Sequence, residues 1–146
     1  MVRIVTDSTS DLPLEIAQEL GITVVPAYVH FGSQSYRDGV DITPEQIYQR
    51  MLSGPVHPTT ASPAPGDFAD AYNRLSQEAS EIVCITVTSR QSAVYEAAMT
   101  GKQSFRGKSR VEVIDSQSVT MGLGLMAILA AKEARSGKAI DQVVEA

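Results

Sequence analysis

Serine and threonine side chains gather in four short stretches of the chain, each placed just before a segment in which apolar residues have helical spacing. Three of these stretches come directly after predicted strands, and the fourth lies in the proline-rich segment HPTTASPAPGDF. Because ligands of open parallel sheets bind beyond the carboxyl ends of the strands, we expect the four stretches to meet at one crevice. They contain Asp7, Ser8, Thr9 and Ser10; Thr59, Thr60 and Ser62; Thr88, Ser89 and Ser92; and Asp115, Ser116 and Ser118.

These hydroxyls have two uses that the sequence alone does not separate. Ser, Thr and Asp are preferred N-caps, and each stretch leads into a predicted helix, so capping accounts for any one of them. Several helix N-termini that point at one crevice, however, form a site for an anionic head group. The prolines of residues 57–68 restrict the backbone around Thr60, so we interpret this segment as a ligand loop that also caps the next helix.

A carboxylate is the anion that best matches the charges around these loops. The loops carry Asp7 and Asp115, and the only nearby cation is Arg90. A phosphate group usually recruits more positive charge or a glycine-rich loop, and the chain has neither a P-loop nor a G-x-G-x-x-G motif. Gly122 and Gly124 lie within a predicted helix, where they indicate close helix packing. Neutral hydroxyl donors suit the single charge of a carboxylate.

A serine nucleophile at Ser89 or Ser92 is the alternative hypothesis, and it predicts a hydrolase or a phosphotransferase on the same sheet. Such a serine needs a base within reach, and the histidines of the chain are His30 and His57. The sequence has no G-x-S-x-G elbow, and two isolated histidines have no metal-ligand spacing, so we expect no metal site. Cys84 stands among apolar neighbours and is expected to be an inert core thiol. A regulatory interaction domain is a third hypothesis.

The elements that position these loops alternate between strand and helix. Short apolar or β-branched runs predict strands at 2–7, 22–31, 81–88 and 110–116, with an edge strand or a bulge at Pro26. The third of these runs is apolar on both parities, which is typical of a central parallel strand. Residues 32–39 predict a tight turn and a short return strand.

Helical patterns fill the segments between the strands. They cover residues 8–21, 41–54, 68–79, 89–105, 118–137 and 139–146. The second has the clearest start, because Thr43 can cap it, Pro44 fits its first position and Gln46 completes a capping box. For the first, Ser10 or Asp11 is the expected cap. We therefore predict an α/β fold with a mostly parallel sheet and helices on both faces.

The composition restricts the class of protein. A chain of 146 residues with 43% hydrophobic residues is expected to form one domain with its own core. The formal net charge of −5 makes nucleic acid a poor partner, because binding phosphates requires clustered Lys and Arg. The apolar run 119–131 is shorter than the ~20 residues of a membrane span, so it predicts a buried core helix. A single cysteine is compatible with a reducing cytoplasm.

Five stretches of the chain resemble motifs of the DegV family of bacterial fatty-acid-binding proteins. In order and spacing they are VTDSTSDLP, YRDGVDIT, PTTASPAPGDF, ITVTSRQSAVYEAA and VIDSQSVTMGLGLMA, and together they span nearly the whole chain. The resemblance implies that a threonine of the proline-flanked loop and serines after the central strand hold the carboxylate of a long-chain fatty acid. The residues expected to bind the ligand are Thr60, Ser62, Thr88, Ser89 and Ser92.

The chain departs from the family pattern in three places. The family sequence Thr-Ser-Gln-Pro is TASP at residues 60–63, and the family pair Ser-Ser is Thr88 and Ser89. The family segment Leu-Ser-Gly-Thr-Tyr becomes QSAVY at residues 91–95. A hydroxyl remains at each of these places, so we expect head-group binding to survive. Gln91 is expected to alter the mouth of the pocket.

The resemblance also implies a role and a domain organisation. Family members of this type are non-catalytic, need no cofactor, and present the fatty acid to a separate kinase subunit in the cytoplasm, with transient proximity to the membrane. The kinase makes an acyl-phosphate for phospholipid synthesis. Such proteins have two lobes, and residues 1–146 are expected to be the first α/β lobe, without the second lobe that closes the site. The acyl chain is expected to enter an apolar tunnel lined by Val94, Ala97, Ala98, Met121, Leu125 and Ile128.

Overall fold

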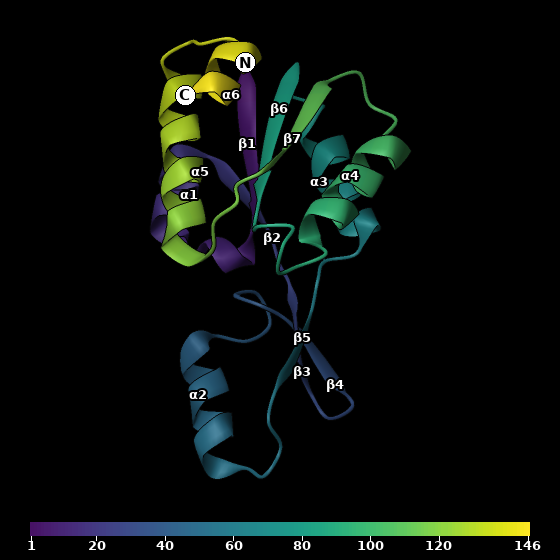
Figure 1. Cartoon of the computed structure of the whole chain (residues 1–146), viewed down its shortest axis with the longest axis vertical. Coiled ribbons are helices and arrows are strands. Elements are labelled where there is room, and N and C mark those ends of the chain that lie inside the picture. The colour runs from purple at the N-terminus through teal and green to yellow at the C-terminus, as the bar shows by residue number, and fades with distance from the viewer.

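The computed structural model describes the whole chain, residues 1–146, and shows a larger and a smaller unit (Figure 1). The larger unit holds a four-stranded parallel sheet with the strand order β2-β1-β6-β7. Its strands are β1 (Val2–Asp7), β2 (Ile22–Val25), β6 (Glu81–Thr86) and β7 (Arg110–Asp115). The smaller unit has a three-stranded antiparallel sheet in the order β4-β3-β5 and one helix, α2. Its elements are β3 (Tyr28–Phe31), β4 (Gln34–Arg37), α2 (Pro44–Ser53) and β5 (Thr59–Ala61).

Helices cover both faces of the parallel sheet. In Figure 1, α1 (Leu14–Leu20) and α5 (Thr120–Arg135) lie on one side of the sheet, and α3 (Pro65–Leu75) and α4 (Val94–Ser104) lie on the other. The short helix α6 (Ile140–Glu145) packs beside α5, near the start of β1. The predicted α/β fold, with a mostly parallel sheet and helices on both faces, is confirmed.

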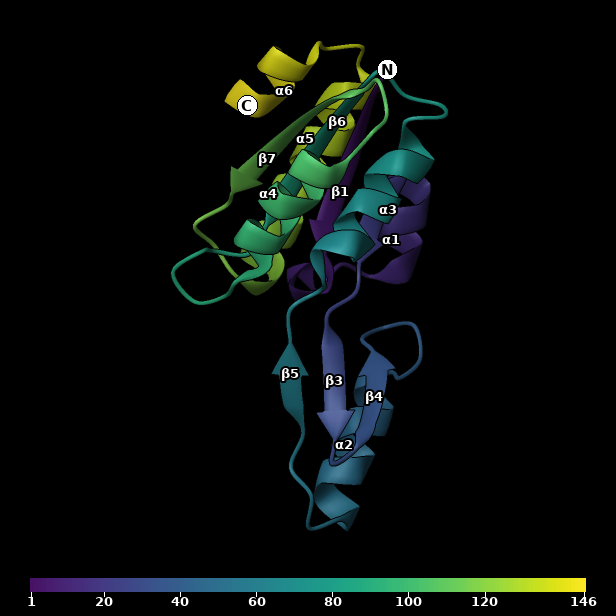
Figure 2. The ribbon, with the colours of Figure 1, turned by 90° about the vertical axis from the view of Figure 1, so that its right-hand side faces the viewer.

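The smaller unit projects beyond the carboxyl edge of the parallel sheet, as Figures 1 and 2 show from two directions. The chain enters it after β2 and leaves it after β5, so two connections join the units. Its helix α2 buries no residue, and the predicted capping box is present: the Gln46 N–H donates to the Thr43 Oγ1, and the Thr43 N–H donates to the Gln46 side chain. The unit therefore adds a surface beside the edge where ligands of parallel sheets bind.

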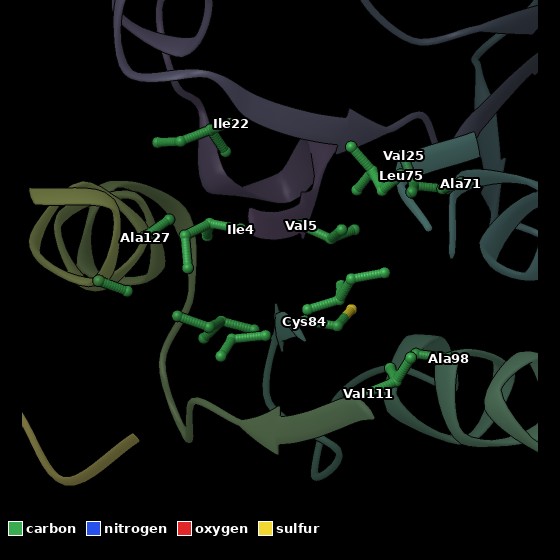
Figure 3. Close-up of a cluster of buried hydrophobic side chains, with 14 of the residues drawn as sticks. Ile4, Val5, Ile22, Val25, Ala71, Leu75, Cys84, Ala98, Val111 and Ala127 are labelled. Atoms are coloured by element: carbon green, nitrogen blue, oxygen red, sulfur yellow. The ribbon is translucent and has the colours of Figure 1, made fainter. Parts of the chain in front are cut away.

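The interior strands β1 and β6 carry the core of the larger unit. Val5, Ile82 and Cys84 are fully buried. Figure 3 shows Ile4 of β1 beside Ala127 of α5, while Val5 and Cys84 lie on the side of α3 and α4. Burial raises the pKa of the Cys84 thiol to about 12, which agrees with the inert core thiol expected there. Each fully buried aliphatic side chain stabilises the fold by about 1.5–3 kcal/mol relative to an exposed one.

The strands around the smaller unit differ from the sequence-based prediction. Residues 22–31 were predicted as one strand with a bulge or edge at Pro26, but they form β2 and β3, which belong to different sheets. The break falls at Pro26 and Ala27, because a proline has no N–H to continue a ladder. Residues 59–61, predicted as part of a loop, form β5 and pair with β3.

The helix starts also differ. Residues 8–21 contain the 3₁₀ helix η1 (Ser8–Ser10) followed by α1, because Asp11 between them adopts a left-handed φ of 52° that stops a continuous helix. Helices predicted to begin at residues 89 and 118 begin at Val94 and Thr120. In both cases the hydroxyl-rich segment forms a longer loop than predicted.

Helix α5 is half buried rather than fully buried as predicted. Leu123, Gly124 and Ala127 are buried, whereas Leu125 is 61% exposed. Gly124 is needed for close packing, as predicted, because a Cβ there would lie 2.6 Å from the carbonyl oxygen of Ser10. No helix of the chain, α5 included, combines the length and the apolar character that crossing a membrane requires.

Candidate functional site

The loops that follow β6 and β7 are tied together at the carboxyl edge of the parallel sheet. The Thr88 N–H donates to the Ser118 carbonyl oxygen at 3.0 Å, and the Ser116 N–H donates to the Thr86 carbonyl oxygen at 3.1 Å. The strands β6 and β7 are neighbours, so their carboxyl ends bring both loops to one place. The stretch with Thr88, Ser89 and Ser92 and the stretch with Asp115, Ser116 and Ser118 therefore meet, as expected.

The loop after β1 is joined to the same edge through Asp7. This side chain is fully buried, and its carboxylate accepts hydrogen bonds from the N–H groups of Val87, at 2.9 Å, and Thr9, at 3.0 Å. The Thr9 hydroxyl donates to it as well. Burial raises the pKa of the Asp7 carboxyl above its ordinary value, against the effect of these hydrogen bonds. Asp7 therefore holds the ends of β1 and β6 together and is not open to a ligand.

The Ser89 hydroxyl donates its single hydrogen bond to the Asp115 carboxylate. The Ser89 Oγ donates to the Asp115 Oδ2 at 2.5 Å, and the Ser89 N–H donates to the Oδ1 at 3.2 Å. The hydrogen bond from the Ser89 hydroxyl is the main cause that lowers the pKa of Asp115, and the nearby charge of Arg90 lowers it further. A hydroxyl has one proton, so Ser89 in this arrangement can accept a hydrogen bond from a ligand but cannot donate one.

Ser62 and Ser92 bring two further loops into contact. Their Oγ atoms lie 3.5 Å apart, and either hydroxyl can be the donor. This separation is long for a bond between hydroxyls, so the pair is weakly held and both protons remain available to a third oxygen. Ser62 follows β5 at the exit of the smaller unit, and Ser92 precedes α4 in the larger unit. The pair therefore sits where the two units meet.

Thr60 and Thr88 have contrasting environments. Thr60 lies in β5, opposite Val29 of β3, and its side chain is exposed. Thr88 is only 5% exposed, and its Oγ1 accepts a hydrogen bond from the Arg90 N–H at 3.3 Å. Of the five residues predicted to bind a ligand, Ser62 and Ser92 contact each other, Ser89 contacts Asp115, Thr60 is open, and Thr88 stabilises its own turn.

The hydroxyls of these loops do not cap the helices that follow them. The N-cap residues of α1, α3, α4 and α5 are Pro13, Ala64, Ala93 and Val119, and none makes a side-chain cap hydrogen bond. The prediction that these side chains serve as N-caps, including the second role given to residues 57–68, is wrong for these four helices, because each N-cap lies one to three residues beyond the last hydroxyl of its stretch. Ser89 and Ser92 therefore do not cap α4. Asp7, in contrast, is the N-cap of the 3₁₀ helix η1 and accepts a hydrogen bond from the Thr9 N–H.

The six residues expected to line an acyl tunnel do not enclose one space. Val94, Ala97 and Ala98 are buried on α4, whereas Met121 and Leu125 are exposed on α5, together with the partly buried Ile128. The parallel sheet lies between these two helices (Figure 1). That expectation is therefore wrong: the residues of α4 are core, Ile128 packs against the core, and Met121 and Leu125 lie on the surface.

The surface on α5 is apolar and begins next to the loop that carries Ser118. Residues 121, 125 and 129 recur every four positions and so share one face of the helix. We call this set the α5 apolar face, and its members are Val119, Met121, Leu125, Met126 and Leu129, which are 39%, 37%, 61%, 43% and 44% exposed. Exposed apolar side chains that form a contiguous patch can mark an interaction site, so we treat this face as a candidate contact surface.

Comparison with known proteins assigns the chain to a family. A family model described as an uncharacterised protein of the DegV family matches residues 1–146. The chain belongs to the DegV family. The resemblance drawn from the five sequence motifs is thereby confirmed. Three of those motifs contain the loops at the carboxyl edge of the parallel sheet, and the other two include β5 and the segment between β4 and α2.

Similar DegV proteins come from several bacteria. A DegV domain-containing protein of Deinococcus radiodurans is 39% identical over 144 residues, which cover 99% of this chain and 50% of the relative. A fatty-acid-binding DegV family protein of Thermus thermophilus has a TM-score of 0.88 at 36% identity, covering 99% of this chain and 51% of that protein. A stearic-acid-binding protein of Eubacterium ventriosum has a TM-score of 0.89 at 31% identity, with the same coverage. The chain thus spans about half the length of the relatives it matches.

Two features of this DegV site were not predicted from the sequence. The first is the hydrogen bond from Ser89 to Asp115, and the second is the strand β5 that carries Thr60. A signal for the first exists, because Asp115 ends one strand and Ser89 follows another that can be its neighbour in a parallel sheet. No local signal identifies β5, since three residues between prolines pair only with a distant strand.

Proposed function

We propose that this chain binds a long-chain fatty acid, with the carboxylate held at the Ser62–Ser92 pair. The observation that carries the proposal is the 3.5 Å separation of the two Oγ atoms at the junction of the two units. One carboxylate oxygen placed against both hydroxyls would accept a hydrogen bond from each. Thr60 supplies a third, exposed hydroxyl from β5, and Thr88 and Ser89 shape the loop that carries Ser92.

The start of α4 adds to the attraction for a negative charge. This helix begins directly after Ala93 and has no side-chain cap, so the N–H groups of its first turn have no hydroxyl or carboxylate partner. The N-terminus of a helix carries a partial positive charge, which favours an anion beside Ser92. A carboxylate here needs no lysine or arginine.

The α5 apolar face gives the acyl chain a place to lie. It starts at Val119, next to the loop that hydrogen-bonds to Thr88. Each methylene group removed from water contributes about 0.8 kcal/mol, so even partial contact with this face strengthens binding. Residues 1–146 leave the face open, and in our proposal they act as the first of two lobes, the second of which covers the acyl chain.

Relatives of known structure support the choice of ligand. The Thermus thermophilus protein is described as fatty-acid-binding and the Eubacterium ventriosum protein as stearic-acid-binding. Both are more than 30% identical to this chain and share its fold over 99% of its length. A long-chain fatty acid is thus the ligand class with the strongest support.

We further propose that the bound acid is presented to a separate kinase subunit, which forms an acyl-phosphate for phospholipid synthesis in the cytoplasm. The family resemblance motivates this part of the proposal. The geometry is compatible with it, because Thr60 and Ser89 are exposed and the head group would lie at the surface of this chain. A carboxylate buried under the core could not be offered to a second protein.

The Ser89–Asp115 pair does not favour the alternative of a serine hydrolase or phosphotransferase. A nucleophilic serine needs a base that readily takes its proton, and the lowered pKa of Asp115 makes this carboxylate a weak base. His57 lies on the exposed segment before β5, and His30 lies in β3; neither imidazole makes a hydrogen bond to a serine side chain. The arrangement instead fixes the position of a loop.

Titration with a fluorescent long-chain fatty acid tests the proposal. We expect Ser92→Ala to weaken binding by about tenfold, since it removes one charge-assisted hydrogen bond. Thr59→Ala is the matched control, because Thr59 is also an exposed hydroxyl of β5 but points to the opposite face of the strand from Thr60. Equal affinity of Ser92→Ala, Thr60→Ala and the unchanged chain would contradict the proposed head-group site.

A further inference from the structure

A pocket of the molecule has neither Ser62 nor Ser92 in its lining. It is a pocket of about 570 Å³ between the larger unit and the segment that leads from β4 to α2. Residues 8–18 and β2 form one wall, and residues 38–44 form the other. The volume falls within the range of about 300–1,000 Å³ typical of small-molecule sites. Two of the five DegV motifs, VTDSTSDLP and YRDGVDIT, meet here.

Hydrogen bonds through Ala27 join the two walls of this pocket. The Ser8 Oγ accepts a hydrogen bond from the Ala27 N–H at 3.0 Å, and the Ala27 carbonyl oxygen accepts one from the Asp38 N–H at 2.9 Å. This chain of contacts runs from the larger unit through the connection to the smaller unit. The pocket is therefore formed before any ligand arrives, which lowers the cost of binding.

The charge in the pocket is negative and uncompensated. Its lining includes Asp11 and Asp38 but no lysine, arginine or histidine. The ion pairs of the chain join other residues, and neither carboxylate accepts a side-chain or backbone hydrogen bond. Burial, and then the charge of Asp38, raise the pKa of Asp11, so the two carboxylates repel each other. A bound cation would relieve this repulsion.

The remaining lining is mostly apolar, and it includes one polar group without a partner. Leu12, Ile22 and Val24 contribute side chains to the wall. Ser10 also belongs to the lining, is fully buried, and its hydroxyl has no hydrogen-bond partner. The N-terminus of α2 borders the pocket through Pro44, which has no N–H to offer an anion.

We propose that this pocket binds a small organic cation, whose ammonium or guanidinium group lies beside Asp11 and Asp38 and whose apolar body lies along Leu12, Ile22 and Val24. The combination of a carboxylate pair with an apolar wall selects such an ion over a bare metal ion, which would need more oxygen ligands. The proposal is independent of fatty-acid binding, since its residues are not those of the head-group site.

A titration of the whole chain followed by amide NMR tests this, with n-hexylammonium, hexanol and hexanoate as matched probes. We expect n-hexylammonium to cause saturable shifts at Gly39 and Val40, and hexanol and hexanoate to bind at least about tenfold more weakly. Stronger binding of hexanoate, equal binding of hexanol, or no saturable shift with n-hexylammonium would overturn the proposal.

Variants of the carboxylates sharpen the test. Asp38→Asn keeps the shape of the side chain and should weaken the binding of n-hexylammonium by about fivefold, as expected for one partly exposed ion pair. Asp11→Asn should act similarly, because asparagine tolerates the left-handed backbone at this position. Glu15→Gln is the control: Glu15 is an exposed carboxylate of α1 outside the lining and should leave the affinity unchanged. Unchanged affinity in Asp38→Asn and Asp11→Asn would equally overturn the proposal.

Discussion

The hydrogen bond from Ser89 to Asp115 limits what Ser89 can do at the proposed head-group site. The Ser89 hydroxyl donates its hydrogen bond to the Asp115 carboxylate, which also accepts hydrogen bonds from the N–H groups of Ser89 and Gln117. The left-handed φ of 52° at Gln117 indicates that this loop is shaped around the carboxylate. Ser89 and Ser92, although three residues apart, therefore have different roles in our proposal: the first fixes the loop, and the second donates a hydrogen bond to the ligand.

The pKa of Asp115 reports this hydrogen bond. We expect Ser89→Ala to raise the pKa of Asp115 toward its ordinary value, because the charged form loses the hydroxyl that stabilises it. A carboxyl titration followed by NMR measures the change. Ser104→Ala, which removes a hydroxyl from α4 that donates to the Gly101 carbonyl oxygen, is the control and should leave Asp115 unchanged. An unaltered pKa in Ser89→Ala would show that the hydroxyl does not hold the carboxylate.

Asp115→Asn should leave the Ser89 hydroxyl free to donate a hydrogen bond to a ligand. The amide oxygen of asparagine can still accept the hydrogen bonds from the backbone N–H groups. Its NH₂ group then faces the Ser89 Oγ and donates a hydrogen bond to it. We expect affinity for an ionised fatty acid to rise by roughly three- to tenfold, because a donor is gained and a negative charge is lost. Fluorescent fatty-acid titration measures it. The double variant Ser89→Ala with Asp115→Asn should lose the part of the gain that comes from the hydroxyl. A fall in affinity in Asp115→Asn would contradict this account.

At the scale of elements, α3 and α4 pack closely because Gly101 has no side chain. A Cβ at Gly101 would lie 2.7 Å from the Pro65 carbonyl oxygen and 2.8 Å from the Phe68 Cβ. We expect Gly101→Ala to lower the free energy of unfolding by about 1–3 kcal/mol, as for other overpacked cores. Gly66→Ala on α3 is the control, since a Cβ there meets nothing within 4 Å, and it should be neutral or slightly stabilising. Urea unfolding that ranks the two variants in the opposite order would contradict this packing.

The α5 apolar face makes a separate prediction for binding. Leu125→Glu should leave the free energy of unfolding within about 0.5 kcal/mol, because the side chain is 61% exposed. It should weaken the binding of a long-chain fatty acid by about tenfold and that of a short-chain acid much less, since the lost contacts involve methylene groups far from the carboxylate. Leu52→Glu, at an 89% exposed position of α2, is the control. If both substitutions have the same effect on binding, the acyl chain does not lie on α5.

Some elements are legible in the sequence because their signals are local. The strand β6 is apolar on both faces, and the start of α2 carries its own capping box. The starts of α4 and α5 are not legible, because Ser92 and Ser118 have the residue type of an N-cap but lie one residue outside the helix caps that form. The pairing of β5 with β3 depends on residues thirty positions away, and no local pattern contains it.

At the scale of the whole molecule, the proposed head-group site exists only because two units meet. Ser62 comes from the exit of the smaller unit, and Ser92 comes from the larger one. The sequence could name these residues through their type and their family motifs, but their contact depends on the strand order β2-β1-β6-β7 and on the direction in which the smaller unit projects. The sequence could therefore predict the class of ligand, whereas the contact between the two serines could be seen only in the fold.

Mass spectrometry of an organic extract from the purified native chain tests the central claim most directly. We expect a long-chain fatty acid to be recovered from residues 1–146, and the amount to fall in Ser92→Ala but not in Thr59→Ala. Such a result would also identify the preferred acyl chain. A chain that carries no fatty acid, and that takes none up when long-chain acids are supplied in excess, would contradict the claim that residues 1–146 bind them.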